Sequence, residues 1–176
     1  MKREVWQRYT QILEREGRFG SPYKMRLKPE YTPVIEPVRF VPYARKRQLK
    51  KELDRMESLG VISKIDEPTE FVNSLVLTTK ENGEMRCCLD PRGLNKCLER
   101  ERYHIKTREE IFSELAGARY FTQIDLKSAY WQILLHEDSK QYTCFGSPFG
   151  RYVYNILRFG VSSGSEICQK RVDTHH

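Results

Sequence analysis

Asp125 and Tyr130 are the two residues whose types and spacing best suit chemistry, and both lie in the segment 120–133. The apolar residues of 120–126 and their period of two predict a strand, near whose end Asp125 lies. A carboxylate at the end of a strand is well placed to hold a hard cation such as Mg2+, which prefers oxygen ligands. The alternative is that Asp125 caps the helical turn after the strand.

A cluster of cations lies in the first half of a helix predicted for residues 43–59, between Pro42 and Gly60. The cluster consists of Arg45, Lys46, Arg47, Lys50 and Lys51. Cations near a helix N-terminus oppose the helix dipole, and an external anion such as a phosphate backbone would offset their repulsion. The cluster is therefore either a phosphate contact or an ordinary solvated face.

Other elements must position these groups. Prolines oppose both helix and central strand in residues 21–42, which predicts an extended surface arm after a short helix within 1–20. Asn82-Gly83 predicts a hairpin of strands 75–80 and 84–89, because both turn residues need positive φ. A capping box from Thr107 to Glu110 predicts a helix over 108–116. The remaining predicted elements are strands at 61–65, 131–135, 142–145 and 152–156 and a helix near 162–172.

The composition favours a polyanionic partner, because 31 lysines and arginines exceed 24 acidic residues and give a net charge of +7. No stretch approaches the roughly 18 apolar residues of a membrane span. The N-terminus lacks the apolar core of a secretory signal, so we expect an intracellular chain, cytoplasmic or nuclear, without membrane contact. The 5 cysteines form no Cys-x-x-Cys pair, which predicts reduced, mostly buried thiols.

Several segments carry motifs in a fixed order along most of the chain. They are Leu53-Asp-Arg-Met-Glu-Ser-Leu-Gly-Val-Ile62, Leu75-Val-Leu-Thr-Thr-Lys-Glu-Asn-Gly83, Arg86-Cys-Cys-Leu-Asp-Pro-Arg-Gly-Leu-Asn-Lys96, Phe121-Thr-Gln-Ile-Asp-Leu-Lys-Ser-Ala-Tyr-Trp-Gln132, Phe145-Gly-Ser-Pro-Phe-Gly-Arg-Tyr152, Arg158-Phe-Gly-Val-Ser-Ser163 and Gln169. This series resembles the reverse transcriptase of gypsy-type LTR retrotransposons.

The resemblance implies an α+β fold with right-hand polymerase architecture, in which an antiparallel sheet packs against helices. The expected parts are an N-terminal helical extension (1–20), the proline-rich arm (21–42), fingers with part of the palm (43–118) and a partial palm (119–176). The family copies RNA into DNA, so the implied partners are an RNA or DNA template-primer, deoxynucleotides and the remainder of a Pol polyprotein.

The resemblance also implies a site for two divalent ions, Mg2+ or Mn2+, which stabilise the attacking and leaving oxygens. Asp125 matches the first metal-binding aspartate, and the backbone carbonyl of Leu126 is a further expected ligand. The family's other two carboxylates lie in a Tyr-x-Asp-Asp hairpin, yet this sequence contains no Asp-Asp pair. We therefore expect the ions not to be fully bound and the chain to be inactive alone. The terminal pair of His175 and His176 is interpreted as a frayed end.

Nucleotide and template contacts are implied as well. Lys80 and Arg86 match phosphate-contacting positions of the fingers hairpin, and an arginine fork suits phosphate. The alternation of Met85, Cys87 and Leu89 predicts that Arg86 faces away from their apolar side. The alternative for Arg86 is an ordinary solvated residue. Asp90, Arg92 and Asn95 match a motif that orients the template and braces the palm, with a local Asx turn at Asp90 as the alternative.

The pocket motif contains both matches and departures. Tyr130 matches the aromatic residue whose size rejects a ribose 2′-hydroxyl, with a core tyrosine as the alternative. Phe159 and Gly160 match the nucleotide pocket, and Gln169 matches the helix that follows. Arg158 stands where the family usually has proline, and Gly164-Ser165 stands where it often has Ala-Pro.

Three hypotheses result. The chain is a reverse transcriptase segment, a non-catalytic basic module that binds nucleic acid, or a degenerate copy without function. We adopt the first for ancestry and class of chemistry.

Overall fold

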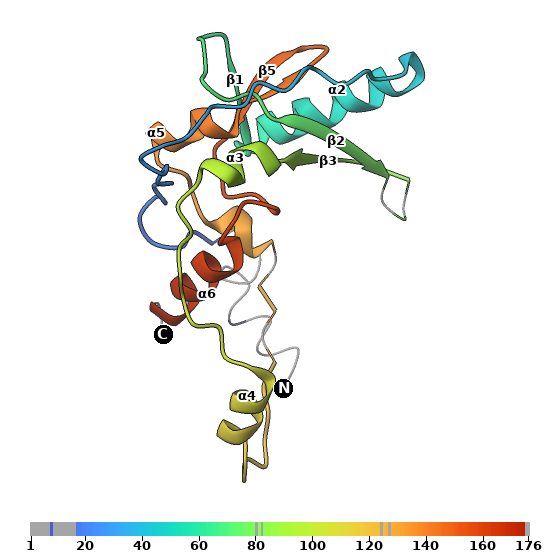
Figure 1. The fold of residues 1–176 in the computed structure, drawn as a ribbon. Helices are drawn as coiled ribbons and strands as arrows, with labels where there is room; N and C mark the ends of the chain where they lie inside the picture. The colour runs from blue at the N-terminus through green and yellow to red at the C-terminus, as the bar shows by residue number, and fades with distance from the viewer. Residues whose placement is uncertain are drawn as a thin grey trace.

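The computed structural model describes residues 8, 17–79, 81, 83–123, 125–126 and 128–174. The helix predicted within residues 1–20 therefore lies almost wholly outside the described residues. Figure 1 shows the described elements, which are α2 (Tyr43–Ser58), β1 (Ile62–Ile65), β2 (Ser74–Thr79), β3 (Met85–Asp90), α3 (Arg92–Cys97), α4 (Arg108–Glu114), η1 (Ala129–Gln132), α5 (Glu137–Lys140), η2 (Gln141–Thr143), β4 (Phe145–Ser147), β5 (Gly150–Tyr154) and α6 (Gly164–Thr174).

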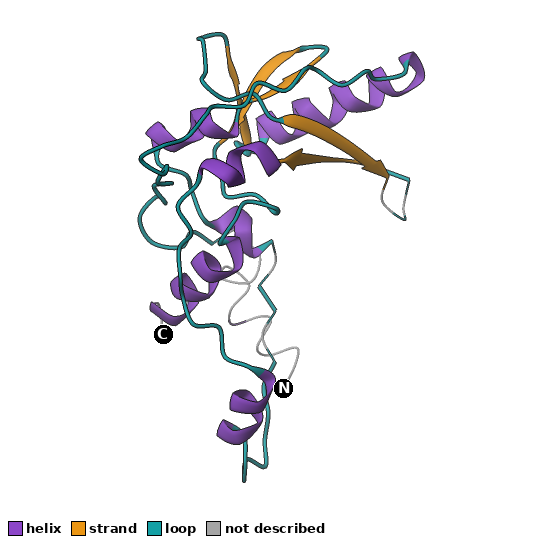
Figure 2. Cartoon of the chain, viewed as in Figure 1, coloured by secondary structure: helices purple, strands orange, loops and turns teal. Residues whose placement is uncertain are grey.

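The described strands form two antiparallel sheets, accompanied by helices (Figure 2), which confirms the α+β class. One sheet has the order β1-β5-β4, and the other is the β2–β3 hairpin. The hairpin has the register that the predicted strands 75–80 and 84–89 imply, because Leu75 pairs with Leu89. A two-residue Asn-Gly turn would place Leu75 opposite Asp90, whereas the observed register keeps apolar residues opposite each other on the buried face. Asn82 itself lies outside the described residues.

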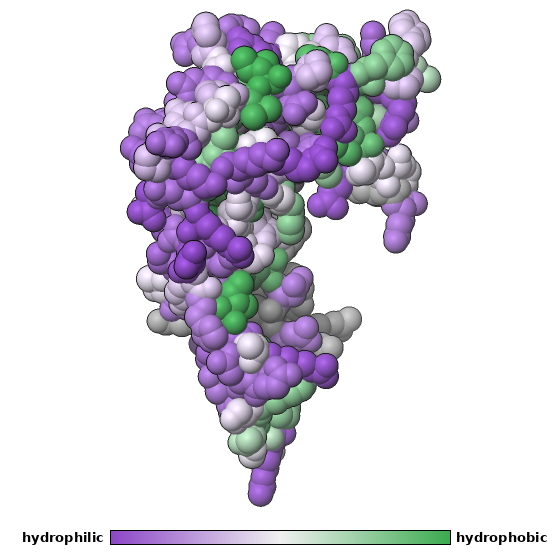
Figure 3. All heavy atoms as spheres, in the orientation of Figure 1, coloured by the Kyte–Doolittle hydropathy of each residue, from purple (hydrophilic) through white to green (hydrophobic). Residues whose placement is uncertain are grey.

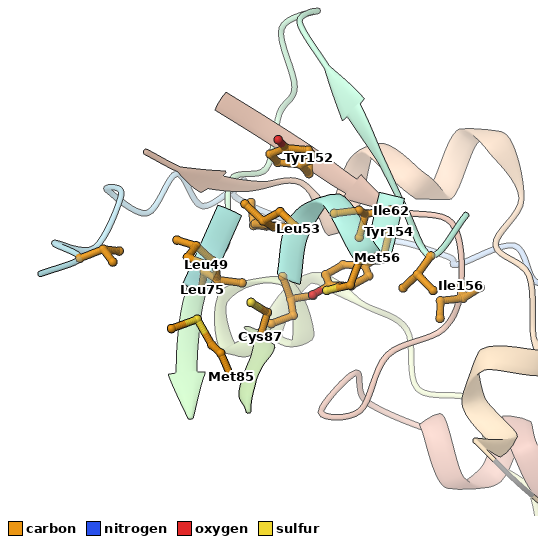
Figure 4. Close-up of a cluster of buried hydrophobic side chains, with 14 residues drawn as sticks. Leu49, Leu53, Met56, Ile62, Leu75, Met85, Cys87, Tyr152, Tyr154 and Ile156 are labelled. Carbon is orange, nitrogen blue, oxygen red and sulfur yellow. The ribbon is translucent and has the colours of Figure 1, made fainter. Parts of the chain in front are cut away.

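The first hydrophobic core joins α2 to both sheets (Figure 4). The sequence predicts an apolar stripe of Leu49, Leu53, Met56 and Leu59 for this helix. The first three are the buried residues of α2, whereas Leu59 is 44% exposed. The three buried residues pack around Tyr154 of β5 and Cys87 of β3. The helix ends before Gly60, whose φ of 66° is the left-handed conformation that favours glycine at this position. The basic N-terminal half of α2 is thereby held beside the hairpin.

A second core supports the segment that carries Tyr130. Its buried members are Met25, Phe71, Leu94, Cys97, Leu98, Ile133, Leu135, Leu157, Val161 and Ile167. The proline-rich arm runs along this core, where the Tyr23 N–H donates to the Leu134 carbonyl at 2.7 Å. The Lys28 N–H donates to the Cys97 carbonyl at 2.9 Å. The arm is extended as predicted, but Met25 anchors it in the core rather than leaving it wholly on the surface.

Helix α4 belongs to a narrow limb that projects from the rest of the molecule in the lower part of Figure 1. Its predicted capping box is confirmed. The Glu110 N–H donates to Thr107 Oγ1 at 3.3 Å, and the Thr107 N–H donates to Glu110 Oε2 at 2.6 Å.

Hydrophilic residues predominate on the face of the molecule drawn in Figure 3, with hydrophobic residues between them.

The strand predicted for residues 120–126 is wrong for the residues that are described there. None of them forms a ladder with a described strand, and Tyr120 is 94% exposed. A strand exists only with a hydrogen-bonded neighbour, so alternation of residue types alone does not create one. Asp125 therefore lies in an exposed loop and not at the end of a strand.

The chain between Ser128 and Ser147 also corrects the prediction. The strand predicted for 131–135 is replaced by η1 and by single bridges at Leu134 and Leu135. The strand predicted for 142–145 is replaced by η2 followed by β4. Helices α3 and α5 were not predicted, because segments of 6 and 4 residues carry little periodic signal.

All 5 cysteines are free and three of them, Cys87, Cys97 and Cys144, are buried, which confirms the prediction of reduced thiols. Burial raises the pKa of the Cys87 thiol to about 12, so this group stays protonated at neutral pH. Among the described residues, no helix is long and apolar enough to cross a membrane.

Candidate nucleotide-binding site

Tyr130 and Phe159 lie against each other, with ring centroids 4.1 Å apart and ring planes at 51°. Tyr130 comes from η1, which begins after Ser128, a residue with a φ of 52°. Phe159 comes from the loop after β5 and is 54% exposed. Tyr130 is half-buried and packs against the second core. The fold thus brings together two residues that the sequence placed in one pocket, with Phe159 open to solvent.

Asn95 braces the pocket loop, which is the segment after β5 that carries Phe159 and Gly160. Its Nδ2 donates to the Gly160 carbonyl at 2.7 Å, and its Oδ1 accepts from the Ser162 N–H at 2.8 Å. Gly160 has a φ of 90°, and a Cβ there would lie 3.3 Å from the ring of Pro91. Glycine is therefore required at this position both for the backbone conformation and for the contact. The bracing predicted for Asn95 is present in the structure, and its role toward a template stays a prediction.

Asp90 is the centre of a small ionic network. Arg92 donates from Nε and Nη2 to its two carboxylate oxygens at 2.9 and 2.8 Å, and Arg39 Nη2 donates at 3.1 Å. The Arg92 guanidinium holds the pKa of Asp90 below its usual value, and the Arg92 backbone N–H acts in the same direction. That backbone contact is the local Asx turn considered above. Asp90 therefore positions two cations and the start of α3.

This network predicts acid-sensitive stability. Because the folded state lowers the pKa of Asp90, its contribution to the free energy of unfolding is present above the usual value of 3.8 and is lost as pH falls through the lower folded value. Asp90→Asn should therefore lower the urea midpoint at about pH 6 and lower it by less at about pH 3. Asp66→Asn is the exposed control. An equal difference at both pH values would contradict the prediction.

Of the two residues predicted to contact phosphate, Arg86 lies on the hairpin. Arg86 is exposed on β3 and faces away from the buried side, as its alternation with Met85 and Cys87 predicted. No described hydrogen bond joins Arg86 to Tyr130 or Phe159. The hairpin points away from α6 in Figure 1. Lys80 lies outside the described residues.

Asp125 and Leu126 do not form a metal site among the described residues. Both are exposed, and no hydrogen bond or ion pair joins the Asp125 carboxylate to another described residue. The described part of the chain also contains no group of three or more His, Cys, Asp or Glu residues that could hold an ion. One solvated carboxylate and one carbonyl do not fit the ligand set of two divalent ions.

Gln169 faces along its own helix, where its Nε2 donates to Asp173 Oδ1 at 2.8 Å. The structure therefore places Gln169 on α6, as predicted, but gives it no described contact with Tyr130 or Phe159.

Arg158 is buried in the first core rather than in the pocket, and it is 6% exposed. Its Nη2 donates to the Cys87 carbonyl at 3.1 Å, and its guanidinium carbon lies 4.7 Å from the ring centroid of Tyr154. Its Nε and the Tyr154 hydroxyl are buried without a described hydrogen-bond partner. Figure 4 shows the Tyr154 hydroxyl pointing toward Cys87. Arg158, which stands where the family usually has proline, thus links the pocket loop to the hairpin through its hydrogen bond with Cys87.

A family profile described as reverse transcriptase (RNA-dependent DNA polymerase) matches residues 78–175. The chain belongs to the reverse transcriptase family. Reverse transcriptases generally use divalent metal ions. An uncharacterized protein of Caenorhabditis elegans is 33% identical over 152 residues, covering 85% of this chain and 12% of that protein. The enzymatic polyprotein of cauliflower mosaic virus (strain NY8153) is 28% identical over 141 residues, covering 79% of this chain and 21% of the polyprotein.

Solved structures of reverse transcriptases share this fold. The native protease-reverse transcriptase of prototype foamy virus superposes with a TM-score of 0.81 at 17% identity, covering 98% of this chain and 24% of that one. A foamy viral protease-reverse transcriptase in complex with double-stranded DNA superposes with a TM-score of 0.75 at 19% identity, covering 97% of this chain and 31% of that one. The arrangement is that of a fingers and palm fragment, as the resemblance implied.

Three residues of the site were missed by reasoning from the sequence. Arg39 joins the Asp90 network, Ser162 binds Asn95, and Ser165 contacts Tyr130. Arg39 and Ser162 carried no signal, because each acts on a partner that is distant in sequence. For Ser165 the sequence did carry a signal, because Gly164-Ser165 departs from the Ala-Pro that the family often has. Its contact with Tyr130 became visible only once the structure placed the Tyr130 ring.

Proposed function

We propose that this chain is the nucleotide- and template-positioning part of a reverse transcriptase, encoded within the Pol polyprotein of a gypsy-type LTR retrotransposon. The observation that carries the proposal is the pairing of Tyr130 with Phe159 on a loop that Asn95 braces, within a reverse transcriptase fold. In this proposal residues 43–118 are fingers with part of the palm, and residues 119–176 are a partial palm.

The proposal gives each predicted site residue a task. Tyr130 underlies the sugar of the incoming nucleotide, and Phe159 and Gly160 line the pocket beside it. Arg86 and Lys80 contact its phosphates once the hairpin approaches. Arg92 and Asp90 orient the template strand, and Gln169 supports the pocket from α6. The foamy viral relative solved with double-stranded DNA supports a template-primer duplex as the ligand.

Asp125 would supply one ligand, with the Leu126 carbonyl beside it, to a Mg2+ or Mn2+ ion. The ions would stabilise the attacking and leaving oxygens of nucleotidyl transfer. The described residues do not fit that pair of ions, and the sequence contains no Asp-Asp pair. We therefore infer that these 176 residues do not polymerise by themselves.

Primer extension tests this inference. The purified chain should extend a labelled DNA primer on RNA or DNA template no more than Asp125→Ala does, with either Mg2+ or Mn2+. The matched exposed control is Asp66→Ala. Synthesis by the wild-type chain that disappears in Asp125→Ala would contradict the inference of inactivity, because it would require a complete metal site.

A second candidate function is nucleic-acid binding without chemistry, and the N-terminal half of α2 favours it. Phe40 and Tyr43 are 88% and 89% exposed beside the cations Arg39, Arg45 and Lys46. Exposed aromatic rings among cations suit stacking on bases and contact with phosphates. This candidate predicts binding without synthesis, which the salt titration in the Discussion measures.

A further inference from the structure

The first turn of α6 also contacts the Tyr130 ring. A Cβ built on Gly164 would lie 3.0 Å from Cε1 of Tyr130, which is shorter than ordinary van der Waals contact. Gly164 has no positive φ, so the contact with the ring, and not the backbone conformation, makes glycine favourable here. The absence of a side chain at Gly164 thus creates a notch that receives the edge of the Tyr130 ring.

The next residue holds the polar end of the same ring. Ser165 Oγ lies 3.2 Å from the Tyr130 hydroxyl, and either oxygen can donate the hydrogen bond. Ser165 is exposed and contributes nothing to the second core. Its contact with Tyr130 is therefore separable from the stability of the fold.

The ring of Tyr130 is consequently fixed from three directions. Phe159 packs against the ring, Gly164 leaves room for its Cε1 edge, and Ser165 binds the hydroxyl. We propose that Gly164 and Ser165 are positioning residues that set the depth of the Tyr130 ring and thereby the discrimination against a ribose 2′-hydroxyl. This inference rests on the proposed function of Tyr130 beneath the nucleotide sugar.

The position of the ring matters because rejection of a 2′-hydroxyl is steric. A ring that is free to tilt leaves room for the hydroxyl, whereas a ring fixed by its own hydroxyl does not. Removing the Ser165 hydroxyl should therefore relax discrimination. Adding a methyl group at Gly164 should displace the ring and weaken binding of any nucleotide.

The test compares dTTP with ribothymidine triphosphate, which differ only in the 2′-hydroxyl. Both are titrated into the chain with Mg2+ and a template-primer whose primer ends in a dideoxynucleotide, so that no chemistry can occur. Binding is followed by the fluorescence of Trp131, which is adjacent to Tyr130. The measured quantity is the dissociation constant of ribothymidine triphosphate divided by that of dTTP. A high ratio means strong discrimination against the 2′-hydroxyl.

Ser165→Ala should lower this ratio about fivefold, the effect of one hydrogen bond, and Ser165→Thr should restore it because it keeps the hydroxyl. Tyr130→Phe should lower it equally, and the double variant should lower it no further, since both changes remove one interaction. Gly164→Ala should weaken binding of dTTP itself about fivefold. Ser113→Ala, on exposed α4, is the matched control and should change neither quantity.

The outcomes separate this inference from the proposed function. A wild-type chain that discriminates, together with an unchanged ratio in Ser165→Ala or additive effects in the double variant, would overturn the inference alone. A wild-type chain that binds neither nucleotide would overturn the proposed function, and the inference with it. Thermal unfolding at the wild-type temperature for Ser165→Ala establishes that the variant is folded.

Discussion

Replacing Arg158 with alanine is expected to lower the free energy of unfolding by about 3 kcal/mol. The guanidinium is buried, donates to the Cys87 carbonyl and lies over the ring of Tyr154. Alanine would leave that carbonyl without its donor and would open a cavity between the pocket loop and β3. Both effects act on the first core, so the hairpin should lose its attachment to the loop.

The charge itself is expected to contribute little. Among the described residues no carboxylate pairs with Arg158, and burying an unpaired guanidinium costs free energy that an apolar side chain avoids. Arg158→Met keeps most of the volume and should change the free energy of unfolding by no more than about 1 kcal/mol. Urea unfolding measures both variants, with exposed Lys64→Ala as the control. An equal loss in the Met and Ala variants would show that the guanidinium is required.

Affinity for a nucleic-acid duplex is expected to fall roughly 2000-fold between about 50 and 200 mM salt. The reason is that the five cations in the first half of α2 and Arg86 would each neutralise one phosphate. At about −0.9 per phosphate, six contacts give a slope near −5.4 in a plot of log affinity against log salt concentration. Fluorescence anisotropy of a labelled duplex measures this slope.

Variants assign the contacts to residues. Lys50→Ala combined with Lys51→Ala should flatten the slope to about −3.6, and Arg86→Ala should flatten it to about −4.5. Lys140 and Lys170 lie outside α2 and each pairs with a carboxylate, as Lys50 does with Asp54, so their double alanine variant is the matched control. Equal slopes in all proteins would exclude α2 and Arg86 as the binding surface. A cooperative thermal transition would exclude a degenerate copy that does not fold.

Patterns local in sequence predicted much of this fold. The stripe of α2, the capping box of α4, the hairpin and the outward side of Arg86 depend on residues within a few positions of each other. The ordered motifs predicted the family, which the comparison with residues 78–175 shows. The motifs also predicted that Tyr130 and Phe159 belong to one pocket, and the two rings are in contact.

Predictions that depended on a partner distant in sequence were less successful. The alternation of residues 120–126 predicted which side chains would share a face of a strand. A strand also needs a hydrogen-bonded neighbouring strand, and the described residues provide none.

The sequence by itself determined the family, the class of fold and the residue types at the pocket, because these are recorded in local patterns and in the order of motifs. Only the tertiary structure decided where those residues lie. It buried Arg158 beneath the hairpin, joined Asn95 to the pocket loop and placed the Tyr130 ring in the notch at Gly164. Each of these contacts joins residues more than thirty positions apart, so its geometry arises from packing of the two cores and not from local preference.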